Sequence, residues 1–124
     1  MADTSAIGAD NRTSRIRYLD GPRLNRALRA GIDRILAERS HLDKINVFPV
    51  PDGDTGTNLA STFGAIAQTL LARRTVHAGQ LLIEVADAAL DGAHGNSGVI
   101  MAQFLQGLAD GLGELPRIRS ADLV

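Results

Sequence analysis

The sequence predicts an all-α protein, and three observations support that fold class. Apolar residues recur at steps of three and four along four separate stretches, which is the spacing of amphipathic helices. No alternation of apolar and polar residues, as in a half-buried strand, extends beyond four residues. Clusters of glycine, proline and short polar residues separate the four stretches. We therefore expect about four amphipathic helices in one domain, since 124 residues fit one domain and hardly more.

The first predicted helix runs from Asp20 to about Ser40. Asp20 is a suitable N-cap, and Pro22 falls in the first turn, where its missing N–H costs nothing. The apolar face is formed by Leu24, Ala27, Leu28, Ile32, Ile35 and Leu36. The opposite face carries arginines and an aspartate, and we interpret it as a solvated charged surface. Residues 1–18 lack the apolar run of a signal peptide and are predicted to be a flexible tail ahead of the domain at 19–124.

An ordered loop is predicted at 42–58, where the helical pattern breaks. Pro49 and Pro51 remove two backbone donors and favour extended conformations in the residues before them. Gly53 and Gly56 permit tight turns. The composition of this loop is therefore compatible with a stiff segment that folds back sharply at its end.

Three further helices are predicted, at about 59–74, at 78–90 and from residue 96 or 97 to about 110. The connection between the last two is rich in glycine, as is the loop at 42–58. In an antiparallel up-and-down arrangement, the loops after the first and third helices lie at the same end. The two glycine-rich loops can therefore form one joint site.

The first candidate site is the tripeptide Asp52-Gly53-Asp54. Two carboxylates separated by one glycine can converge on a hard cation such as Mg²⁺, which in turn holds phosphate oxygens. The following Thr55-Gly56-Thr57-Asn58 offers hydroxyls and backbone N–H groups at a helix N-terminus, which favours anions. The structural alternative is an Asx-turn with a helix cap.

Several other classes of protein are excluded or disfavoured. An EF-hand loop starting at Asp52 needs Gly and Glu where Thr57 and Phe63 stand. Without cysteine, any metal must have oxygen or imidazole ligands. A net charge of -1 gives no case for nucleic acid as the main partner. No stretch approaches the roughly 18 apolar residues of a membrane span, and we expect a cytoplasmic protein.

The second candidate site is the segment 92–98, Gly-Ala-His-Gly-Asn-Ser-Gly. A nucleophilic role for Ser97 is disfavoured, because the elbow pattern needs glycine where Val99 stands. The alternatives are a helix N-cap at Ser97 or a glycine-rich loop that contacts a phosphate or a base. The three histidines of the chain have no partner at metal-ligand spacing and are predicted to be surface or loop residues: His41, His77 and His94.

Residues 46–58 and 92–103 resemble the two signature loops of the dihydroxyacetone kinase L-domain family, known as DhaL-like. They are most similar to the N-terminal domain of fatty acid kinase catalytic subunits. The first reads Asn-Val-Phe-Pro-Val-Pro-Asp-Gly-Asp-Thr-Gly-Thr-Asn, and the second reads Gly-Ala-His-Gly-Asn-Ser-Gly-Val-Ile-Met-Ala-Gln. Both occur in the family order and at a similar separation.

The resemblance implies a fold and a set of site residues. The fold would be an eight-helix barrel with ATP or ADP at one end, of which this chain resembles the first half. The ligands of two Mg²⁺ ions would include Asp52, Asp54 and, at a third metal-facing position, Asn46. Phosphates would be contacted by Thr55, Gly56, Thr57 and Asn58. The nucleotide would be lined by Asn96, Ser97 and Gly98. No catalytic residue is assigned.

The activity implied is phosphorylation of a fatty acid to an acyl phosphate, with the fatty acid presented by a separate lipid-carrier protein. The stretch Phe-Pro-Val-Pro favours this branch over the dihydroxyacetone kinases, whose loop is shorter. Dihydroxyacetone kinase-type transfer, a nucleotide-binding module without activity of its own, and a plain interaction domain are the alternatives.

The sequence also departs from the family pattern. His94 replaces the usual Arg, Arg39-Ser40 replaces an Asn-Lys-like pair, and no later Gly-Thr-x-Leu-Thr-like motif follows. Because four helices cannot close an eight-helix barrel, we expect self-association or a complementing chain over an exposed apolar face.

Overall fold

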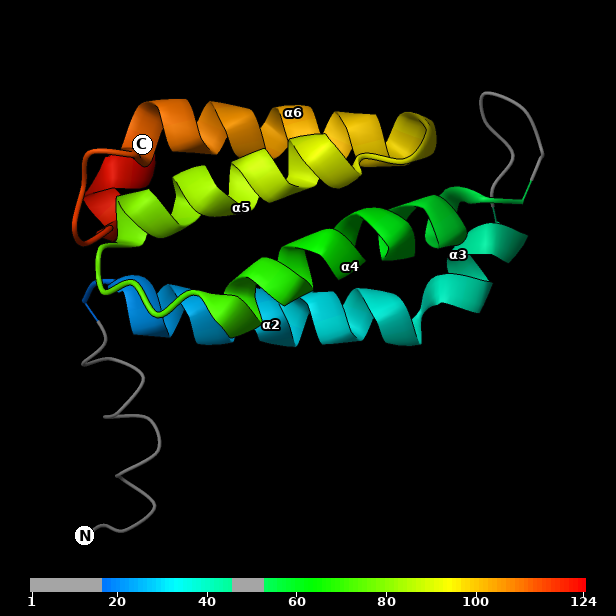
Figure 1. The fold of residues 1–124 in the computed structure, drawn as a ribbon, viewed down its shortest axis with the longest axis horizontal. Coiled ribbons are helices and arrows are strands. Elements are labelled where there is room, and N and C mark those ends of the chain that lie inside the picture. The colour runs from blue at the N-terminus through cyan, green and yellow to red at the C-terminus, as the bar shows by residue number, and fades with distance from the viewer. Residues whose placement is uncertain (1–16, 46–52) are drawn as a thin grey trace, which may run out of the picture.

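The computed structural model describes residues 17–45 and 53–124, and this part of the chain is helical (Figure 1). The predicted all-α class is confirmed, since the described residues form α-helices and one short 3₁₀ helix but no strand. The elements in chain order are α2 (Gly21–Ala37), α3 (Arg39–Lys44), α4 (Thr55–Ala72), α5 (Ala78–Gly92), α6 (Gly95–Leu112) and η1 (Ser120–Leu123).

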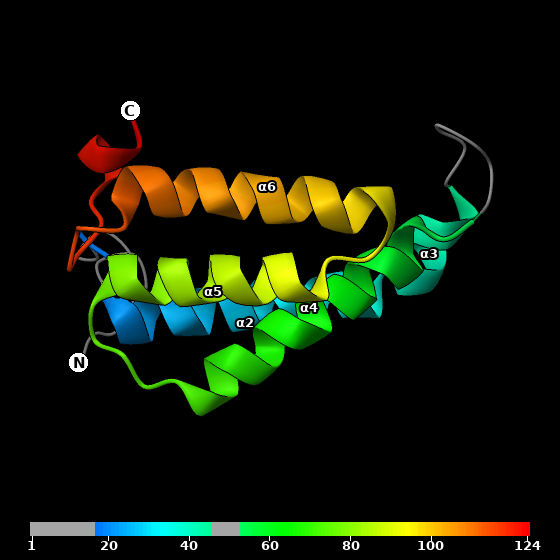
Figure 2. The ribbon, with the colours of Figure 1, turned by 45° about the horizontal axis from the view of Figure 1, so that its top comes forward.

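The four long helices run back and forth along one direction (Figure 1). The start of α4 and the α5–α6 connection therefore lie at one end, together with α3, while the start of α2 and the α4–α5 connection lie at the other. α5 packs against α2 and α4 and has α6 on another side (Figure 2). The prediction that the two glycine-rich loops share one end is confirmed for their described residues.

The core is aliphatic, as a chain with 3% aromatic residues requires. Its largest fully buried side chains are Ile66, Leu70, Leu81 and Val85, on the facing sides of α4 and α5. Burying each such side chain stabilises a fold by about 1.5–3 kcal/mol. The only polar side chain buried among the described residues is Thr62, which lies near the end where the two loops meet.

The first predicted helix ends earlier than expected. The predicted end near Ser40 is wrong, because α2 ends at Ala37 and Glu38 interrupts it. The amide of Glu38 donates to the carbonyls of Arg34 and Ile35, at 3.2 and 3.1 Å, which is the bifurcated pattern of a helix end. A second short helix, α3, follows at once.

The predicted bounds of the loop, 42–58, are wrong at both ends. Its first three residues belong to α3 and its last four to the first turn of α4. Six residues are too few for a periodic pattern, and packing on α4 positions this short helix. A Cβ at Gly56 would overlap the carbonyl of Arg39, so the missing side chain lets the two backbones approach closely.

The boundaries of α5 and α6 next to the site differ from the predicted ones by two residues or fewer. The predicted cap of α2 is confirmed, since Asp20 Oδ1 accepts a hydrogen bond from the Arg23 amide at 3.0 Å. α5 continues two residues past position 90, and α6 begins at Gly95, just before the predicted start.

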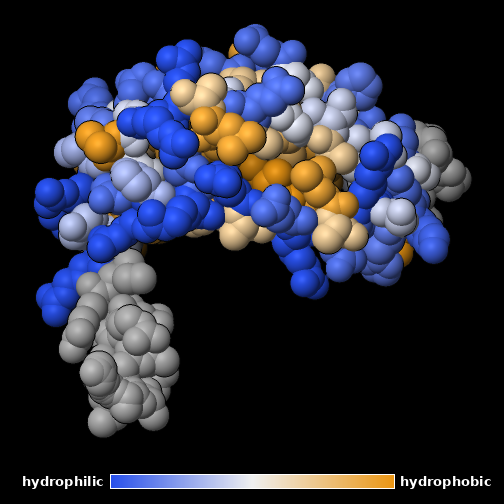
Figure 3. Space-filling model, turned by 60° about the horizontal axis from the view of Figure 1, so that its bottom comes forward, coloured by the Kyte–Doolittle hydropathy of each residue, from blue (hydrophilic) through white to orange (hydrophobic). Residues whose placement is uncertain are grey.

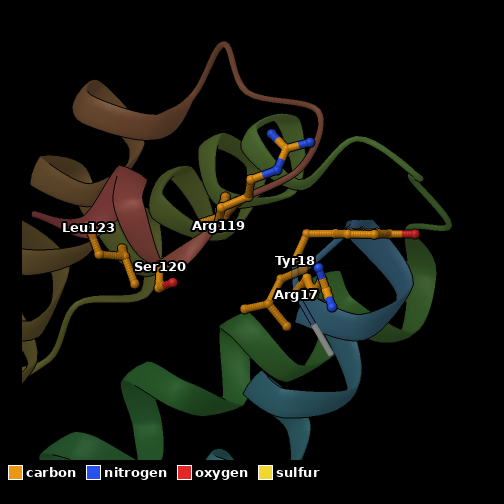
Figure 4. A pocket seen from close by; sticks show the side chains of 7 residues that line it. Arg17, Tyr18, Arg119, Ser120 and Leu123 are labelled. Atoms are coloured by element: carbon orange, nitrogen blue, oxygen red, sulfur yellow. The ribbon is translucent and has the colours of Figure 1, made fainter. Parts of the chain in front are cut away.

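The two ends of the described chain meet beside the start of α2. The backbones of Leu19 and Ile118 exchange two hydrogen bonds of 2.8 and 2.9 Å. The Tyr18 ring makes cation–π contacts with the guanidinium groups of Arg23 and Arg117, which lie 4.8 and 4.9 Å from its centroid. A cavity of about 530 Å³ separates this segment from η1 (Figure 4). The boundary of the tail predicted at 1–18 stays a prediction, because residues 1–16 lie outside the described part.

Exposed apolar side chains occur at several places on the surface, and two of them are described here. On the side where α2 lies, apolar residues form an area flanked by hydrophilic ones (Figure 3). On the outer side of α6, Val99, Ile100 and Phe104 are 49%, 69% and 61% exposed. Exposed apolar area of this kind marks a contact surface in many proteins. None of the described helices is both long enough and apolar enough to cross a membrane.

Candidate functional site

The two segments singled out in the sequence contact each other at the end of the molecule where α4 and α6 begin. The Ser97 hydroxyl, in the first turn of α6, donates to the carbonyl oxygen of Thr55 at 3.3 Å. Thr55 is the first residue of α4. The N-terminal turns of both helices therefore lie together.

Thr62 fixes the distance between these two helices. Its side chain is 0% exposed, and its hydroxyl donates to the Asn58 carbonyl at 2.9 Å within α4. The same oxygen accepts from the backbone N–H of His94 at 3.1 Å, just before α6. A Cβ at Gly98 would overlap this oxygen, so only glycine permits the observed approach.

Gly95 places the α5–α6 connection against Asn58. It has a positive φ of 64°, which glycine adopts without strain, and a Cβ there would overlap the Asn58 side chain. Of the residues predicted to bind nucleotide, Thr55, Asn58, Ser97 and Gly98 are thus brought together directly or through one neighbour. Asn96 lies in the same turn of α6 and is exposed to solvent.

Asp43, which was not predicted as a site residue from the sequence, binds the first turn of α4 with both carboxylate oxygens. Oδ1 accepts from the Thr57 amide at 2.9 Å, and Oδ2 accepts from the Thr57 hydroxyl at 2.7 Å. The expectation that the N–H groups of this turn are free is therefore wrong for Thr57. The signal in the sequence was weak, because Asp43 lies in a stretch assigned to the loop and its partner is 14 residues away.

Hydrogen bonds from Thr57 lower the pKa of the Asp43 carboxyl below its ordinary value of 3.8. The Thr57 hydroxyl has the largest effect, followed by the Thr57 amide, while partial burial opposes them and the Gly56 amide and the Arg39 charge assist. Arg39 also reaches the Thr57 hydroxyl, with Nε at 3.4 Å from the oxygen. An acidic and a basic side chain of α3 therefore hold the start of α4.

Asp54 stands at the N-cap position of α4, but its side chain does not cap the helix. The carboxylate that holds the first turn is that of Asp43 instead, so helix capping does not account for Asp54. Gly53 before it has a φ of 68°, as expected for a sharp turn. Among the described residues, no group of three or more acidic or histidine side chains is arranged to hold a metal.

Two of the three predicted metal ligands, Asn46 and Asp52, lie outside the described residues, so the metal set stays a prediction. The observation that bears on it is the donor chemistry at the start of α4. Asp54 supplies carboxylate oxygens beside a helix N-terminus, and oxygen donors of this kind suit Mg²⁺.

Ser97 is not the N-cap of α6. The cap position belongs to His94, whose side chain makes no capping hydrogen bond, and Ser97 lies inside the first turn. The Ser97 hydroxyl instead joins α6 to α4. The other histidines have surface positions as predicted: His41 is exposed on α3, and His77 caps α5, with Nδ1 accepting from the Gln80 amide at 3.0 Å.

Comparison with known proteins agrees with this geometry. The model of the DAK2 domain family matches residues 49–124. The protein YloV of Bacillus subtilis is 38% identical over 94 residues, which cover 76% of this chain and 17% of YloV. An uncharacterised protein of Staphylococcus saprophyticus is 33% identical over a stretch with the same coverage. An uncharacterised protein of Staphylococcus aureus is 37% identical over 79 residues, or 64% of this chain and 14% of that protein.

The matched region begins just before the first candidate site and includes both contacting segments, α4, α5 and α6. The chain spans about 17% of the length of YloV, so the match describes one part of such a protein. Proteins of the matched family bind ADP or ATP, which indicates a nucleotide-binding module of the dihydroxyacetone kinase type. This chain belongs to the DAK2 domain family, the family of DhaL-type domains.

Proposed function

We propose that this chain is the Mg²⁺–ATP-binding part of a kinase that phosphorylates a fatty acid to an acyl phosphate. The observation that supports this most is the contact between the two signature segments, through the Ser97 hydroxyl and the Thr55 carbonyl. It puts the starts of two helices side by side, next to Asp54. Helix N-termini attract anions, and a carboxylate beside them is suited to the cation that accompanies a polyphosphate.

In this proposal, phosphates bind at the first turn of α4 and the remainder of the nucleotide lies along Asn96, Ser97 and Gly98. Mg²⁺ would be held by Asp52, Asp54 and Asn46, and would offset the negative charge of the phosphates. Since Asp43 already binds the Thr57 amide and hydroxyl, a direct phosphate contact by Thr57 requires that carboxylate to move aside. Arg39, next to the Thr57 hydroxyl, is a positive group within reach of the same turn.

A fatty acid is the preferred acceptor because the segment ahead of Asp52 has the length and the Phe-Pro-Val-Pro composition of that branch. A carboxylate acceptor is already ionised at pH 7, so no general base is needed to generate the nucleophile. Transfer would then depend on positioning and on charge stabilisation. The second candidate, dihydroxyacetone kinase-type transfer, has a neutral hydroxyl acceptor and is favoured by family membership alone.

Partners are also part of the proposal. A separate lipid-carrier protein would present the fatty acid, in the cytoplasm where ATP is available. The exposed side chains of Val99, Ile100 and Phe104 on α6 support contact with a complementing chain or with a second copy.

The test is calorimetric titration of this chain with ADP, with and without Mg²⁺. We expect binding that depends on Mg²⁺ and that is lost in Asp54→Ala and Asp52→Ala. Asp33→Ala is the matched control, because it removes an exposed carboxylate of α2 that belongs to neither of the two predicted site segments. Equal ADP affinity in Asp54→Ala and Asp33→Ala would contradict the proposed site. Phosphate transfer from ATP to a carrier-bound fatty acid, but not to dihydroxyacetone, would then establish the acceptor.

A further inference from the structure

A groove lined by four arginines lies at the opposite end of the molecule from the candidate site. Arg26 and Arg29 reach it from α2, and Arg73 and Arg74 reach it from the residues that follow α4. Pro22, Asn25 and Thr75 complete its lining, and its volume is about 290 Å³. We call this cavity the arginine groove.

No sequence pattern indicates that these four residues lie together. Arg26 and Arg29 belong to the face of α2 that we interpreted as a solvated surface, and Arg73-Arg74 follow the last residue of α4. The fold brings the two pairs together although more than 40 residues separate them. A shared groove is a stronger feature than either pair alone, because both pairs can act on one ligand.

Two hydrogen bonds join the backbone segments that carry the arginines of the groove. The side-chain amide of Asn25 donates to the Leu70 carbonyl at 2.9 Å, which joins α2 to the last turn of α4. The Gly21 amide donates to the Val76 carbonyl at 2.8 Å, which joins the start of α2 to the α4–α5 connection. The four arginines therefore extend from fixed positions, so less conformational freedom is lost when a ligand binds.

Within the described residues, 17–45 and 53–124, the positive charge of the groove has no acidic partner. No lining residue in this part of the chain is acidic, and none of the four guanidinium groups forms an ion pair there. The ion pair found on α2 is between Arg34 and Glu38, outside the groove. Four like charges in one small space repel one another, in a chain whose net charge is only -1. An anion of two or more charges would relieve this repulsion.

Phosphate fits this arrangement better than carboxylate. Each guanidinium presents a planar fork of N–H donors that pairs with two oxygens at once. A carboxylate has two oxygens and is satisfied by one or two such forks, whereas a phosphate group offers three oxygens to donors that come from several directions. Forks from two different elements around one cavity are therefore suited to a phosphate group.

We propose that the arginine groove binds a phosphate-bearing ligand, at a site separate from that of the Mg²⁺–nucleotide. The separation follows from α4, whose 18 residues join the two ends of the molecule. At about 1.5 Å per residue, this helix holds the two sites roughly 27 Å apart. A small phosphorylated compound and the headgroup of an anionic lipid share the recognised chemistry, and the experiment distinguishes them.

The experiment uses this chain in EDTA, so that binding through a divalent cation is removed. Inorganic pyrophosphate is titrated while the amide signals of ¹⁵N-labelled protein are followed by NMR. In parallel, flotation is measured with vesicles of phosphatidylglycerol and of phosphatidylcholine. The test variant is Arg29→Gln/Arg73→Gln. The control is Arg34→Gln/Arg119→Gln, which removes the same charge from exposed positions outside the groove.

We expect shifts around Arg26, Arg29 and Thr75, and an affinity at least tenfold weaker in the test variant than in the control. Saturable binding of pyrophosphate identifies a small phosphorylated ligand, and binding to phosphatidylglycerol vesicles alone identifies a lipid headgroup. Either result, lost in the test variant, supports the groove. Absence of both kinds of binding, or equal weakening of binding in the test variant and the control variant, would overturn the proposal. Because the replaced arginines are exposed, neither variant should lose structure. Circular dichroism should therefore show the same helix content in the wild type and in both variants.

Discussion

The two ends of the helical bundle are held together by different kinds of interaction. At the end of the candidate site, α3, α4 and α6 are joined by short polar side chains, chiefly Asp43, Thr62 and Ser97. At the other end, the segments are joined mainly by backbone hydrogen bonds. These connect Leu19 with Ile118, Gly21 with Val76, Ala78 with Pro116 and Gly79 with Leu115.

The difference has a consequence for mutation. Backbone hydrogen bonds survive most side-chain substitutions, whereas a side-chain link is lost with its side chain. The site end should therefore be sensitive to single conservative changes, and the other end should tolerate them. Substitutions at the two ends can test this contrast.

The largest effect is expected for Gly98→Ala. The new Cβ would overlap the Thr62 hydroxyl oxygen and push α6 away from α4. Overpacking of this kind destabilises by about 3 kcal/mol. The matched control is Gly107→Ala on the same helix, where a Cβ meets no atom within 4 Å. That change should stabilise the chain by up to about 1 kcal/mol, because alanine is the better helix former. Urea denaturation measures both, and equal effects would refute the close approach at Gly98.

The second prediction concerns the buried hydroxyl of Thr62. Thr62→Val keeps the shape but removes the hydrogen bonds to the Asn58 carbonyl and from the His94 amide. A buried amide without a partner costs about 1–3 kcal/mol. We expect a loss of about 2 kcal/mol in the free energy of unfolding, together with weaker nucleotide binding. Thr69→Val, a half-buried change on the same helix, is the control and should cost less.

The third prediction concerns Asp43 and pH. Because hydrogen bonds from Thr57 lower the pKa of this carboxyl in the folded chain, the charged form stabilises the fold. This contribution is present above the ordinary pKa of 3.8 and is lost as the pH falls through the lowered folded value. Asp43→Asn should therefore reduce the melting temperature at pH 7, and the difference from the wild type should shrink below about pH 3.8.

The matched control for this change is Asp33→Asn, an exposed carboxylate of α2. It should leave the melting temperature nearly unchanged across the same pH range. A difference between wild type and Asp43→Asn that persists undiminished at pH 2.5 would show that the stabilisation does not come from ionisation. Asp43→Asn should also change the affinity for ADP, because the first turn of α4 is part of the proposed phosphate site.

The long helices and the meeting of the two glycine-rich segments could be predicted from the sequence. Both depend on patterns that repeat: apolar residues such as Leu81, Leu82 and Val85 at helical spacing, and glycines at helix ends. Antiparallel topology then places the loops after the first and third helices at one end. These are properties of long segments, in which many residues contribute to one signal.

The features that could not be predicted are single contacts between distant residues. α3 is too short to show a period, and its place depends on the close approach of Arg39 to Gly56. The hydrogen bonds that Thr57 donates to Asp43 are also single contacts between residues 14 positions apart. The residues around Asp43 do not indicate that Thr57 is its partner. The same holds for the arginine groove, which exists only because α2 and the end of α4 lie side by side.

The smallest effect is expected at the far end, in His77→Ala. His77 caps α5 by accepting a hydrogen bond from the Gln80 amide at 3.0 Å, and loss of an N-cap costs about 0.5–2 kcal/mol. We expect the low part of that range, because backbone hydrogen bonds from Ala78 and Gly79 hold the same turn. His77→Asn should recover most of the loss, since asparagine is a good N-cap. Affinity for Mg²⁺–ADP should stay within twofold of the wild type in both variants. If His77→Ala weakened nucleotide binding as much as Thr62→Val, the two ends would be coupled through the bundle, and the contrast between them would not extend to function.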